Sequence, residues 1–425
     1  MNRNPFKLLP LQAAGVAILA GWQFGATPAA AQTPPPPPPP GAPAPVAPAP
    51  AEAPTSPLTA PALSGPLAMS TTPYNFEAAG LGKVYVSGVL SGLGLFQTDP
   101  TTVFYQGKFQ HDNGSNFDIS NGMLIAQKID GFFQFYAQGG VYSFPALGVN
   151  YNVTQKAVTT YNAYFGAAPI VYGKIVPNDI FNVEFGKLPT LIGAEYAFTF
   201  QNMNIERGLL WNQEPIVSTG VQANLTTGPL AWSLSFNDGF YSGNYNWISG
   251  AATWTIDPQN TLAVTAGGNV NNFNGNTVAT PYFQNNSDIV DLIYTYNAAP
   301  WTISPYFQYT TVSKNPSLGA TKGAETWGGA ILAKYTLNDN WNLAGRLEYI
   351  GSSGSATDGS PSLLYGPGSD AWSVTVTPTW QNDIYFARIE GSYVGASSTT
   401  PGFAFGKTGN SKSQERLLLE AGILF

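Results

Sequence analysis

Residues 217–236, which read VSTGVQANLTTGPLAWSLSF, decide the fold. Apolar or small side chains occupy every second position of the first arm, from Val217 to Leu225, and again of the second arm, from Leu230 to Phe236. A short turn containing glycine and proline separates the two arms. A period of two residues on both sides of a tight turn predicts a β-hairpin with one apolar face and one polar face.

The same hairpin pattern recurs as far as the last residue. It predicts an all-β, transmembrane, antiparallel up-and-down β-barrel of about 16 strands. Short turns rich in Asn, Asp, Gly and Pro alternate with long polar loops, which is typical of barrels with short periplasmic turns and long outer loops. The expected strands cover residues 84–96, 117–127, 132–142, 169–176, 180–187, 217–225, 230–236, 248–256, 262–270, 290–296, 301–309, 329–337, 341–349, 372–380, 385–393 and 416–425.

The composition favours a membrane sheet over a soluble domain. Charged residues make up 10% of the chain, against about 25% in ordinary soluble domains. After the N-terminal region, no apolar run approaches the ~20 residues of a membrane helix. The net charge of −7 argues against a nucleic-acid partner. The chain has no cysteine, so we expect no disulfide and no thiolate metal site, and no sequence pattern indicates a cofactor or another metal.

Aromatic residues gather at two levels of the predicted strands. Tyr309, Tyr349 and Tyr393 fall in the outward register, at the strand ends that lie away from the short turns. Amphipathic rings concentrate at the two membrane–water interfaces, so this distribution indicates a barrel in a bilayer, with outer-membrane lipid around it. The tryptophans beside the short turns, also outward, are Trp232, Trp254, Trp301, Trp341 and Trp380.

Two prolines lie inside predicted strands. Pro305 and Pro378 each lack the N–H that would join the strand ladder. We therefore expect a local β-bulge at each of them. In lipid the remaining backbone groups must all be paired, which requires a closed sheet.

The N-terminal region predicts export. Residues 1–31 combine Arg3 and Lys7 with an apolar stretch and a small-residue cleavage site, so we expect a signal peptide whose removal leaves Gln32 first. Residues 32–82 form a Pro/Ala-rich segment that predicts a disordered periplasmic linker, either a plain spacer or a docking arm. Residues 83–425 then form the barrel, in the outer membrane of a Gram-negative bacterium.

A barrel of this size is too wide for its own side chains to fill, so it encloses water. Arg346 and Glu348, like Arg388 and Glu390, are two residues apart on neighbouring up-going strands and predict a charged ladder on the lumen wall. The ladder either neutralises itself or selects among ions. The charged residues in the inward register are Lys174, Glu184, Asp291, Lys334, Arg346, Glu348, Arg388, Glu390 and Glu420.

The longest insertion between strong strands covers residues 188–215, between the fifth and sixth strands. Large apolar residues are unusual in a solvent-exposed loop, and this one holds Tyr196, Phe198, Phe200, Leu209, Leu210 and Trp211. Folding into the lumen would bury them and narrow the pore; packing on the rim or on another subunit is the alternative. The aromatic rings also offer a stacking surface for sugars. The charged residues of the insertion are Glu195, Glu206, Arg207 and Glu214, and their net negative charge predicts a mild preference for cations.

Short motifs around the insertion resemble a known family. Gly186-Lys187, Ile192-Gly193-Ala194-Glu195, Glu214-Pro215 and Thr219-Gly220-Val221 resemble the central region of the OmpL-like β-barrel porin-2 family of Gram-negative outer-membrane proteins. A tyrosine-rich stretch expected after Glu195 is replaced here by residues 197–204. The resemblance implies passive diffusion of small hydrophilic solutes and no enzymatic activity.

Two further features are similar to trimeric general porins and their relatives. The strand number and the place of the insertion resemble those porins, which implies a homotrimer. The terminal Phe425 resembles the aromatic signal that the barrel-assembly machinery reads.

Two other functions stay open from the sequence. An outer-membrane hydrolase would use a histidine base, and the chain has one histidine, His111, in an expected outer loop. A structural or adhesive barrel that conducts nothing is the second alternative.

Overall fold

The computed structural model describes residues 65–70, 73–105, 108–151, 164–271, 284–316 and 320–425. The expected signal peptide and the first part of the expected linker lie outside these ranges. Within them, no helix has the length and apolar character needed to cross a bilayer.

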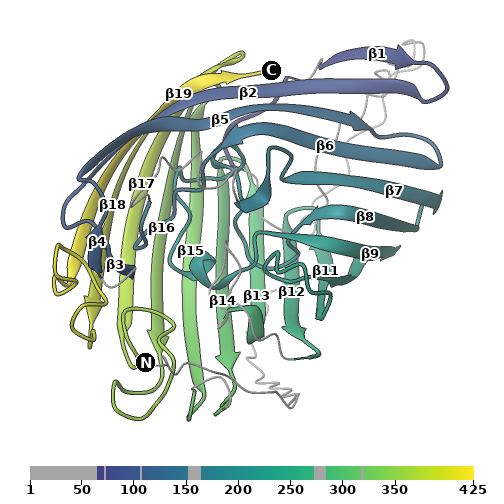
Figure 1. Cartoon of the computed structure of the whole chain (residues 1–425). Coiled ribbons are helices and arrows are strands. Elements are labelled where there is room, and N and C mark those ends of the chain that lie inside the picture. Colours follow the sequence, from purple (N-terminus) through teal and green to yellow (C-terminus); the bar gives the residue numbers. More distant parts are fainter. Residues whose placement is uncertain (1–64, 71–72, 106–107, 152–163, 272–283, 317–319) are drawn as a thin grey trace, which may run out of the picture. The chain divides into compact units, whose positions relative to one another are not determined.

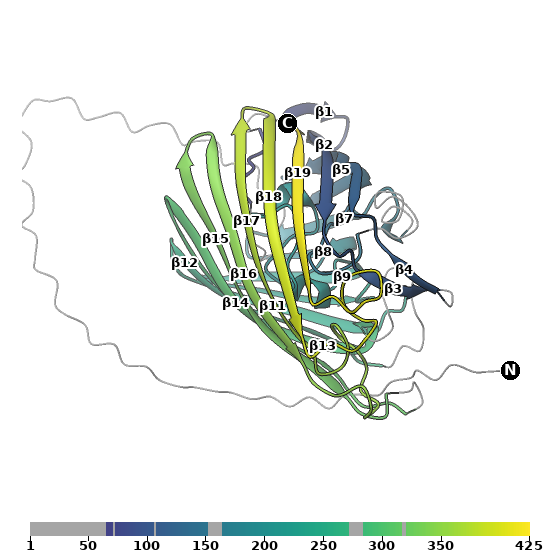
Figure 2. The same cartoon turned by 90° about the vertical axis from the view of Figure 1, so that its left-hand side faces the viewer.

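The strands form one antiparallel sheet that closes on itself, and 16 strands make its wall. Each wall strand pairs with the next one along the chain, and β19 returns to pair with β2 (Figures 1 and 2). The predicted fold class and strand count are therefore confirmed. The wall strands are β2 (Gly82–Gln97), β5 (Ser115–Lys128), β6 (Phe133–Tyr142), β7 (Ile170–Asn178), β8 (Phe181–Pro189), β9 (Val217–Thr227), β10 (Leu230–Asn237), β11 (Trp247–Asp257), β12 (Asn260–Asn269), β13 (Ser287–Ala298), β14 (Trp301–Val312), β15 (Ala324–Asn338), β16 (Trp341–Ser352), β17 (Asp370–Asn382), β18 (Tyr385–Ser397) and β19 (Ser413–Leu424).

The alternating sequence pattern sets which face each side chain takes. Leu234 on β10 lies opposite Ala223 on β9 and is 62% exposed on the outer face. Its neighbour Ser235, which points inward, is buried. Because side chains alternate along a strand, this register repeats around the wall. It puts apolar residues toward lipid and polar residues toward the lumen.

Aromatic pairs form two levels on the outer face. Near the short turns, Trp341 lies opposite Trp380. At the other strand ends, Tyr349 lies opposite Trp372, whose ring centroid is 5.1 Å from that of Tyr393. The two levels match the two interfaces of a bilayer.

The bulges expected at Pro305 and Pro378 are absent. Pro305 lies opposite Ile331 on β15, and Pro378 lies opposite Leu343 on β16. On the second neighbouring strand, β13 for Pro305 and β18 for Pro378, the pairing has the same register before and after the proline. The physical reason is that a missing N–H removes one bond of the ladder without requiring an extra residue.

The segment expected to be a linker contains β1 (Tyr74–Ala78), which pairs with the start of β2. Strand β19 pairs with β2 only from Val89 onward, so the first residues of β2 would otherwise form an open edge. Strand β1 covers that edge, which satisfies its backbone groups. A separate hairpin of β3 (Thr102–Tyr105) and β4 (Lys108–His111) lies in the connection between β2 and β5.

The depth of a residue on the lipid-facing wall predicts how much a charge at that position costs in stability. Ile331 lies opposite Pro305, midway between Trp301 and Tyr309, so it is at the centre of the outer face. Replacing Ile331 with Arg should lower the free energy of unfolding in lipid vesicles by about 2–4 kcal/mol, whereas Leu337→Arg, beside a short turn, should cost about 0–1 kcal/mol. Denaturant titration in vesicles measures both values. Equal costs would contradict the assigned depth.

Candidate functional site: the inserted loop and the charged wall

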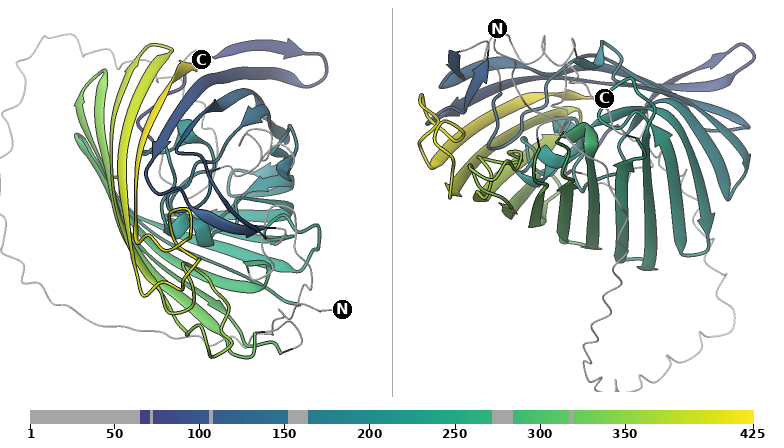
Figure 3. Two further views of the ribbon diagram at one scale, coloured as in Figure 1. Left: turned by 60° about the vertical axis from the view of Figure 1, so that its left-hand side comes forward. Right: turned by 60° about the horizontal axis from the view of Figure 1, so that its bottom comes forward.

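The inserted loop, residues 188–215, begins at the end of β8 and stops just before β9. It contains two short 3-10 helices, η1 (Thr199–Gln201) and η2 (Leu210–Gln213). Its large apolar side chains, including Phe198, Leu209 and Trp211, are buried. Figure 3 shows this teal part of the chain within the ring of strands. Its polar contacts with the wall involve inward-facing residues of β5, β13, β14 and β16 to β19.

Arg388 on β18 binds the first part of the loop. Its Nη1 donates to the carbonyl of Thr199 at 2.9 Å, and its Nη2 donates to the carbonyls of Asn202 at 2.9 Å and Met203 at 2.8 Å. Glu420 on β19 forms the ion pair with Arg388, at 3.4 Å. A guanidinium presents several donors in a fixed plane, so one side chain satisfies three carbonyls of a non-repetitive segment.

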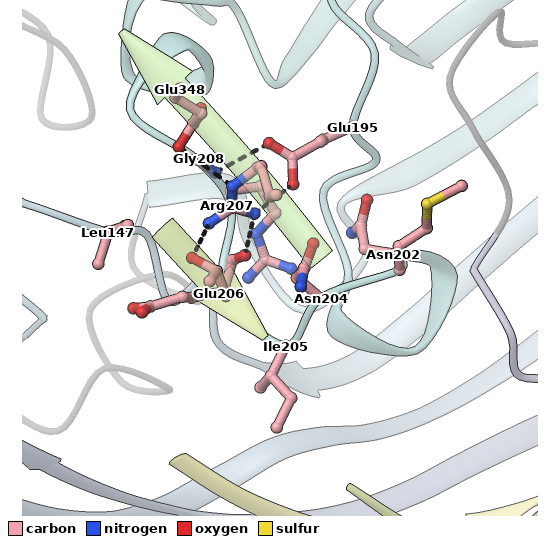
Figure 4. Close-up of polar contacts among 12 residues, drawn as sticks. Leu147, Glu195, Asn202, Asn204, Ile205, Glu206, Arg207, Gly208 and Glu348 are labelled. Carbon is pink, nitrogen blue, oxygen red and sulfur yellow. Dashed lines mark hydrogen bonds and ion pairs between the residues drawn. The ribbon is translucent and has the colours of Figure 1, made fainter. Parts of the chain in front are cut away.

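Arg346 on β16 binds the middle of the loop. Its Nη1 contacts Glu195 Oε1 at 2.9 Å and donates to the carbonyl of Glu206 at 2.8 Å. Its Nε pairs with Glu348 Oε2 at 3.1 Å. Both members of the predicted pair Arg346 and Glu348 therefore meet the inserted loop. Figure 4 shows Glu348 beside Gly208 of that loop.

Wall carboxylates accept the N–H groups of the same loop. Glu348 accepts from Leu209 at 3.0 Å. Glu390 on β18 accepts from Ile205 and, at 2.9 Å, from Glu206. Arginines thus bind loop carbonyls while glutamates bind loop N–H groups, so the wall satisfies a backbone that has no ladder of its own.

A second loop, residues 143–151, completes the cluster, and no sequence pattern predicted its contact with the inserted loop. Arg207 donates its backbone N–H to Pro145 at 3.0 Å and accepts one from Leu147 at 2.8 Å. Arg416 on β19 joins both loops, because its Nη1 contacts Glu206 Oε2 at 2.9 Å and the carbonyl of Ala146 at 2.6 Å. Arg416 was missing from the predicted wall residues, although it shares the inward register of Glu420.

The remaining predicted residues lie elsewhere on the lumen wall. Lys174 on β7 and Glu184 on β8 form an ion pair at 3.2 Å. The ladder expected between Arg388 and Glu390 is replaced by the pair between Arg388 and Glu420 across β18 and β19. Glu214, near the end of the inserted loop, accepts from Gln308 Nε2 at 2.8 Å.

A segment of the N-terminal region also touches the inserted loop. Gly65 donates its N–H to the carbonyl of Gln201 at 2.8 Å. Gln381, at a short turn, makes two hydrogen bonds to the backbone of Ala68, at 2.9 and 2.8 Å. A Cβ at Gly65 would lie 2.2 Å from the carbonyl oxygen of Asn202, so the two backbones are in close contact. Residues 65–70 therefore behave as part of the barrel.

Burial shifts the pKa of two acidic residues of the inserted loop. Burial raises the pKa of Glu195, and the guanidinium of Arg346 opposes that rise. Burial and the neighbouring charge of Asp291 raise the pKa of Glu214 well above its usual range. Glu195 has a cationic partner, whereas the charges around Glu214 are acidic.

A cavity of about 200 Å³ adjoins the end of the inserted loop. Trp211, Phe165 and Phe240 give it aromatic walls, and Glu214 gives it a carboxyl group. This volume exceeds the ≈30 Å³ that one water occupies in the liquid, so the cavity has space for several waters or a small solute.

The network makes a prediction about stability. Arg388→Gln removes the donors to three loop carbonyls and leaves Glu420 without its ion pair. The free energy of unfolding should fall by about 3–5 kcal/mol. Lys334→Gln changes a half-buried charge on the same wall and should cost no more than about 1 kcal/mol.

Urea unfolding in detergent micelles measures both values, and limited proteolysis at residues 196–208 reports release of the loop. Equal stability and equal protection in the two variants would contradict the anchoring role of Arg388.

The chain is similar to outer-membrane barrels of other bacteria. The family model described as putative beta-barrel porin-2, OmpL-like, matches residues 83–425. Comparison with curated protein sequences finds no match. Among solved structures, outer-membrane expressed OmpT of Vibrio cholerae gives a TM-score of 0.51 at 13% identity, over 83% of this chain and 100% of that chain. The outer membrane channel DcaP of Acinetobacter baumannii gives 0.52 at 11% identity, over 82% and 99%. At these identities the likeness is one of fold alone.

Proposed function

Because the chain belongs to the OmpL-like putative β-barrel porin-2 family, we propose that it is an outer-membrane channel for passive diffusion of small hydrophilic solutes and ions. The observation that carries the proposal is the polar inner face of a 16-strand wall. Near the short turns, inward side chains such as Ser233, Thr253 and Asn342 are only half-buried, so that part of the lumen is open to water. Barrels of this width hold water rather than a side-chain core.

We propose further that the inserted loop narrows the channel. Its support is the set of bonds from wall arginines and glutamates to the loop backbone, which hold it on the lumen side of β16 to β19. Two anchors at separate heights, Arg346 and Arg388, would keep the loop from swinging out. The aromatic cavity beside Trp211 offers a place where a solute ring could stack.

The alternatives differ from a channel in what they would do in a bilayer. A structural or adhesive barrel would not conduct. A hydrolase would depend on His111, which ends β4 and whose side chain lies outside the described part of the structure. Lipid or peptide hydrolysis that vanished in a His111→Ala variant would favour the enzyme.

Planar-bilayer recording tests the channel and its constriction together. The protein should produce stable conductance steps. A variant in which residues 198–205 are replaced by a short Gly-Ser linker should give larger steps, because the lumen cross-section grows when the loop is shortened.

The control shortens an outer loop at residues 355–359 and should leave the step size unchanged. Absence of steps from the wild-type protein would overturn the channel. Steps of equal size in the wild type and the loop variant would overturn the constriction alone.

The charges of the lumen support a mild preference for cations. With Arg416 and Asp118 included, the inward register of the wall carries five basic residues (Lys174, Lys334, Arg346, Arg388, Arg416) against six acidic ones (Asp118, Glu184, Asp291, Glu348, Glu390, Glu420), which leaves one negative charge. The inserted loop carries Arg207 against Glu195, Glu206 and Glu214, which leaves a negative excess.

In a potassium chloride gradient the reversal potential should therefore indicate potassium over chloride. The preference should shrink as salt rises from 0.1 M to 1 M, because the screening length falls from about 10 Å to about 3 Å. A reversal potential that favours chloride would contradict this assignment.

The expected partners follow from the ends of the chain and from the resemblance. Phe425 exchanges backbone hydrogen bonds with Gly88, at 2.8 and 2.9 Å, and its ring covers that glycine. This outward aromatic end suits the barrel-assembly machinery. Cleavage after residue 31 would leave a proline-rich arm in the periplasm. The resemblance to general porins supports a homotrimer, which light scattering of the detergent-extracted protein would detect.

A further inference from the structure

Three neighbouring strands place one row of polar side chains under the ends of the inserted loop. Thr265 on β12, Asp291 on β13 and Gln308 on β14 lie directly opposite one another. Asp291 Oδ2 accepts from Thr265 Oγ1 and from the backbone N–H of Gly193, each at 2.9 Å. Gln308 Nε2 binds Glu214 Oε1 at 2.8 Å. Both the start and the end of the inserted loop therefore meet at this row.

Gly193 brings the two carboxyl groups together. A Cβ at Gly193 would lie 1.8 Å from Glu214 Oε2, so this oxygen lies against the Cα of the residue whose N–H binds Asp291. The φ of Gly193 is +88°, in the region that favours glycine. The missing side chain of Gly193 thus leaves room for the carboxyl group of Glu214 beside the backbone N–H that binds Asp291.

Each carboxyl group has an oxygen without a partner. Among the described residues, neither Glu214 Oε2 nor Asp291 Oδ1 has a hydrogen-bond partner, and neither residue forms an ion pair. The two side chains are 4% and 0% exposed. By contrast, Glu195, Glu206, Glu348 and Glu420 each pair with an arginine. Buried polar atoms are almost always satisfied, so these two oxygens are candidate ligand atoms.

Two neutral oxygens come from positions beside the two carboxyl groups. Within the described part of the chain, Tyr306 Oη and Gln308 Oε1 also lack partners, and both side chains are buried. Gln308 lies opposite Asp291 on the inward face of β14, and Tyr306 is two residues before Gln308 on the same face.

We propose that Glu214 and Asp291 form a binding site for one hard divalent cation, with Ca²⁺ as the ion that fits best. The bare oxygens are Glu214 Oε2 and Asp291 Oδ1, and two carboxylates balance a double positive charge. The set contains oxygen and neither nitrogen nor sulfur, which favours Ca²⁺ or Mg²⁺ over zinc. Ca²⁺ tolerates irregular geometry and 6–8 ligands, so amide, hydroxyl and water oxygens complete its shell.

The adjoining cavity gives such an ion a source of water ligands, because Glu214 also lines that cavity. An ion at this place would tie both ends of the inserted loop to β13 and β14. It would complement Arg346 on β16 and Arg388 on β18, which bind the segment between those two ends. The site goes beyond the proposed function, since it does not require that the barrel conducts.

Calorimetric titration of the full chain with CaCl₂ tests the site directly. The protein is refolded in detergent without lipopolysaccharide and stripped with EDTA. The wild type should bind about one Ca²⁺ with saturation. Glu214→Gln and Asp291→Asn keep the side-chain shape and should weaken binding at least ~10-fold. Glu184→Gln, whose carboxylate pairs with Lys174 elsewhere on the lumen wall, is the matched control and should bind as the wild type does.

Thermal unfolding gives a second measurement that a purely structural role would not reproduce. In EDTA, Glu214→Gln and Asp291→Asn should be at least as stable as the wild type, because each removes a buried charge that lacks a partner. Added Ca²⁺ should raise the melting temperature of the wild type and of Glu184→Gln only.

No saturable binding by the wild type, or equal binding by all four proteins, would overturn the site. Variants that are less stable than the wild type in EDTA would show that the two carboxyl groups are partnered within the protein, most simply by sharing a proton, and would overturn it as well.

Discussion

Backbone hydrogen bonding in lipid is the constraint on which the rest of this structure depends. The bilayer interior offers no water to an unpaired N–H or C=O, and each such group costs several kcal/mol. The pairing of β19 with β2 removes the open edge of the sheet. Two backbone hydrogen bonds between Phe425 and Gly88 extend this pairing to the last residue. Strand β1 pairs with the beginning of β2, which β19 does not reach, and so satisfies the backbone groups there.

Inside the closed barrel, a second backbone needs hydrogen-bond partners, that of the inserted loop. Sixteen strands surround more space than their own side chains fill, and the inserted loop that enters it has little secondary structure. Its backbone is satisfied by charged side chains instead. Arg388 donates hydrogen bonds to three loop carbonyls, and Glu390 accepts hydrogen bonds from two loop N–H groups. The charged residues of the lumen therefore act as hydrogen-bond partners for the backbone of a loop.

Much of this architecture was predictable because its signals are local. A period of two, turn residues and outward tryptophans such as Trp341 depend only on neighbours in sequence. The insertion was recognisable because it contains large apolar residues such as Trp211, which are unusual in a solvent-exposed loop. Six of the ten predicted site residues lie on wall strands and four in the inserted loop, and their role in a pore stays a prediction.

The failures concern contacts between distant parts of the chain. The contact of residues 143–151 with Arg207 and Arg416 joins segments more than 50 residues apart, and no local pattern marks it. The pairing of β1 depends on where β19 ends. The approach of Glu214 to Asp291 depends on the positive φ of Gly193 and on the register of three strands. Pro305 was misjudged because its effect depends on the neighbouring strand as well as on the residue itself.

Spin labelling at single cysteines tests the central claim most directly, since the native chain has none. Labels at Leu234 and Leu343 should be accessible to oxygen dissolved in the bilayer. Labels at their neighbours Ser233 and Asn342 should be accessible to a water-soluble nickel chelate. A closed, water-filled barrel predicts this opposite accessibility at both adjacent pairs. Equal accessibility of neighbours to either reagent, or the reverse assignment, would contradict it.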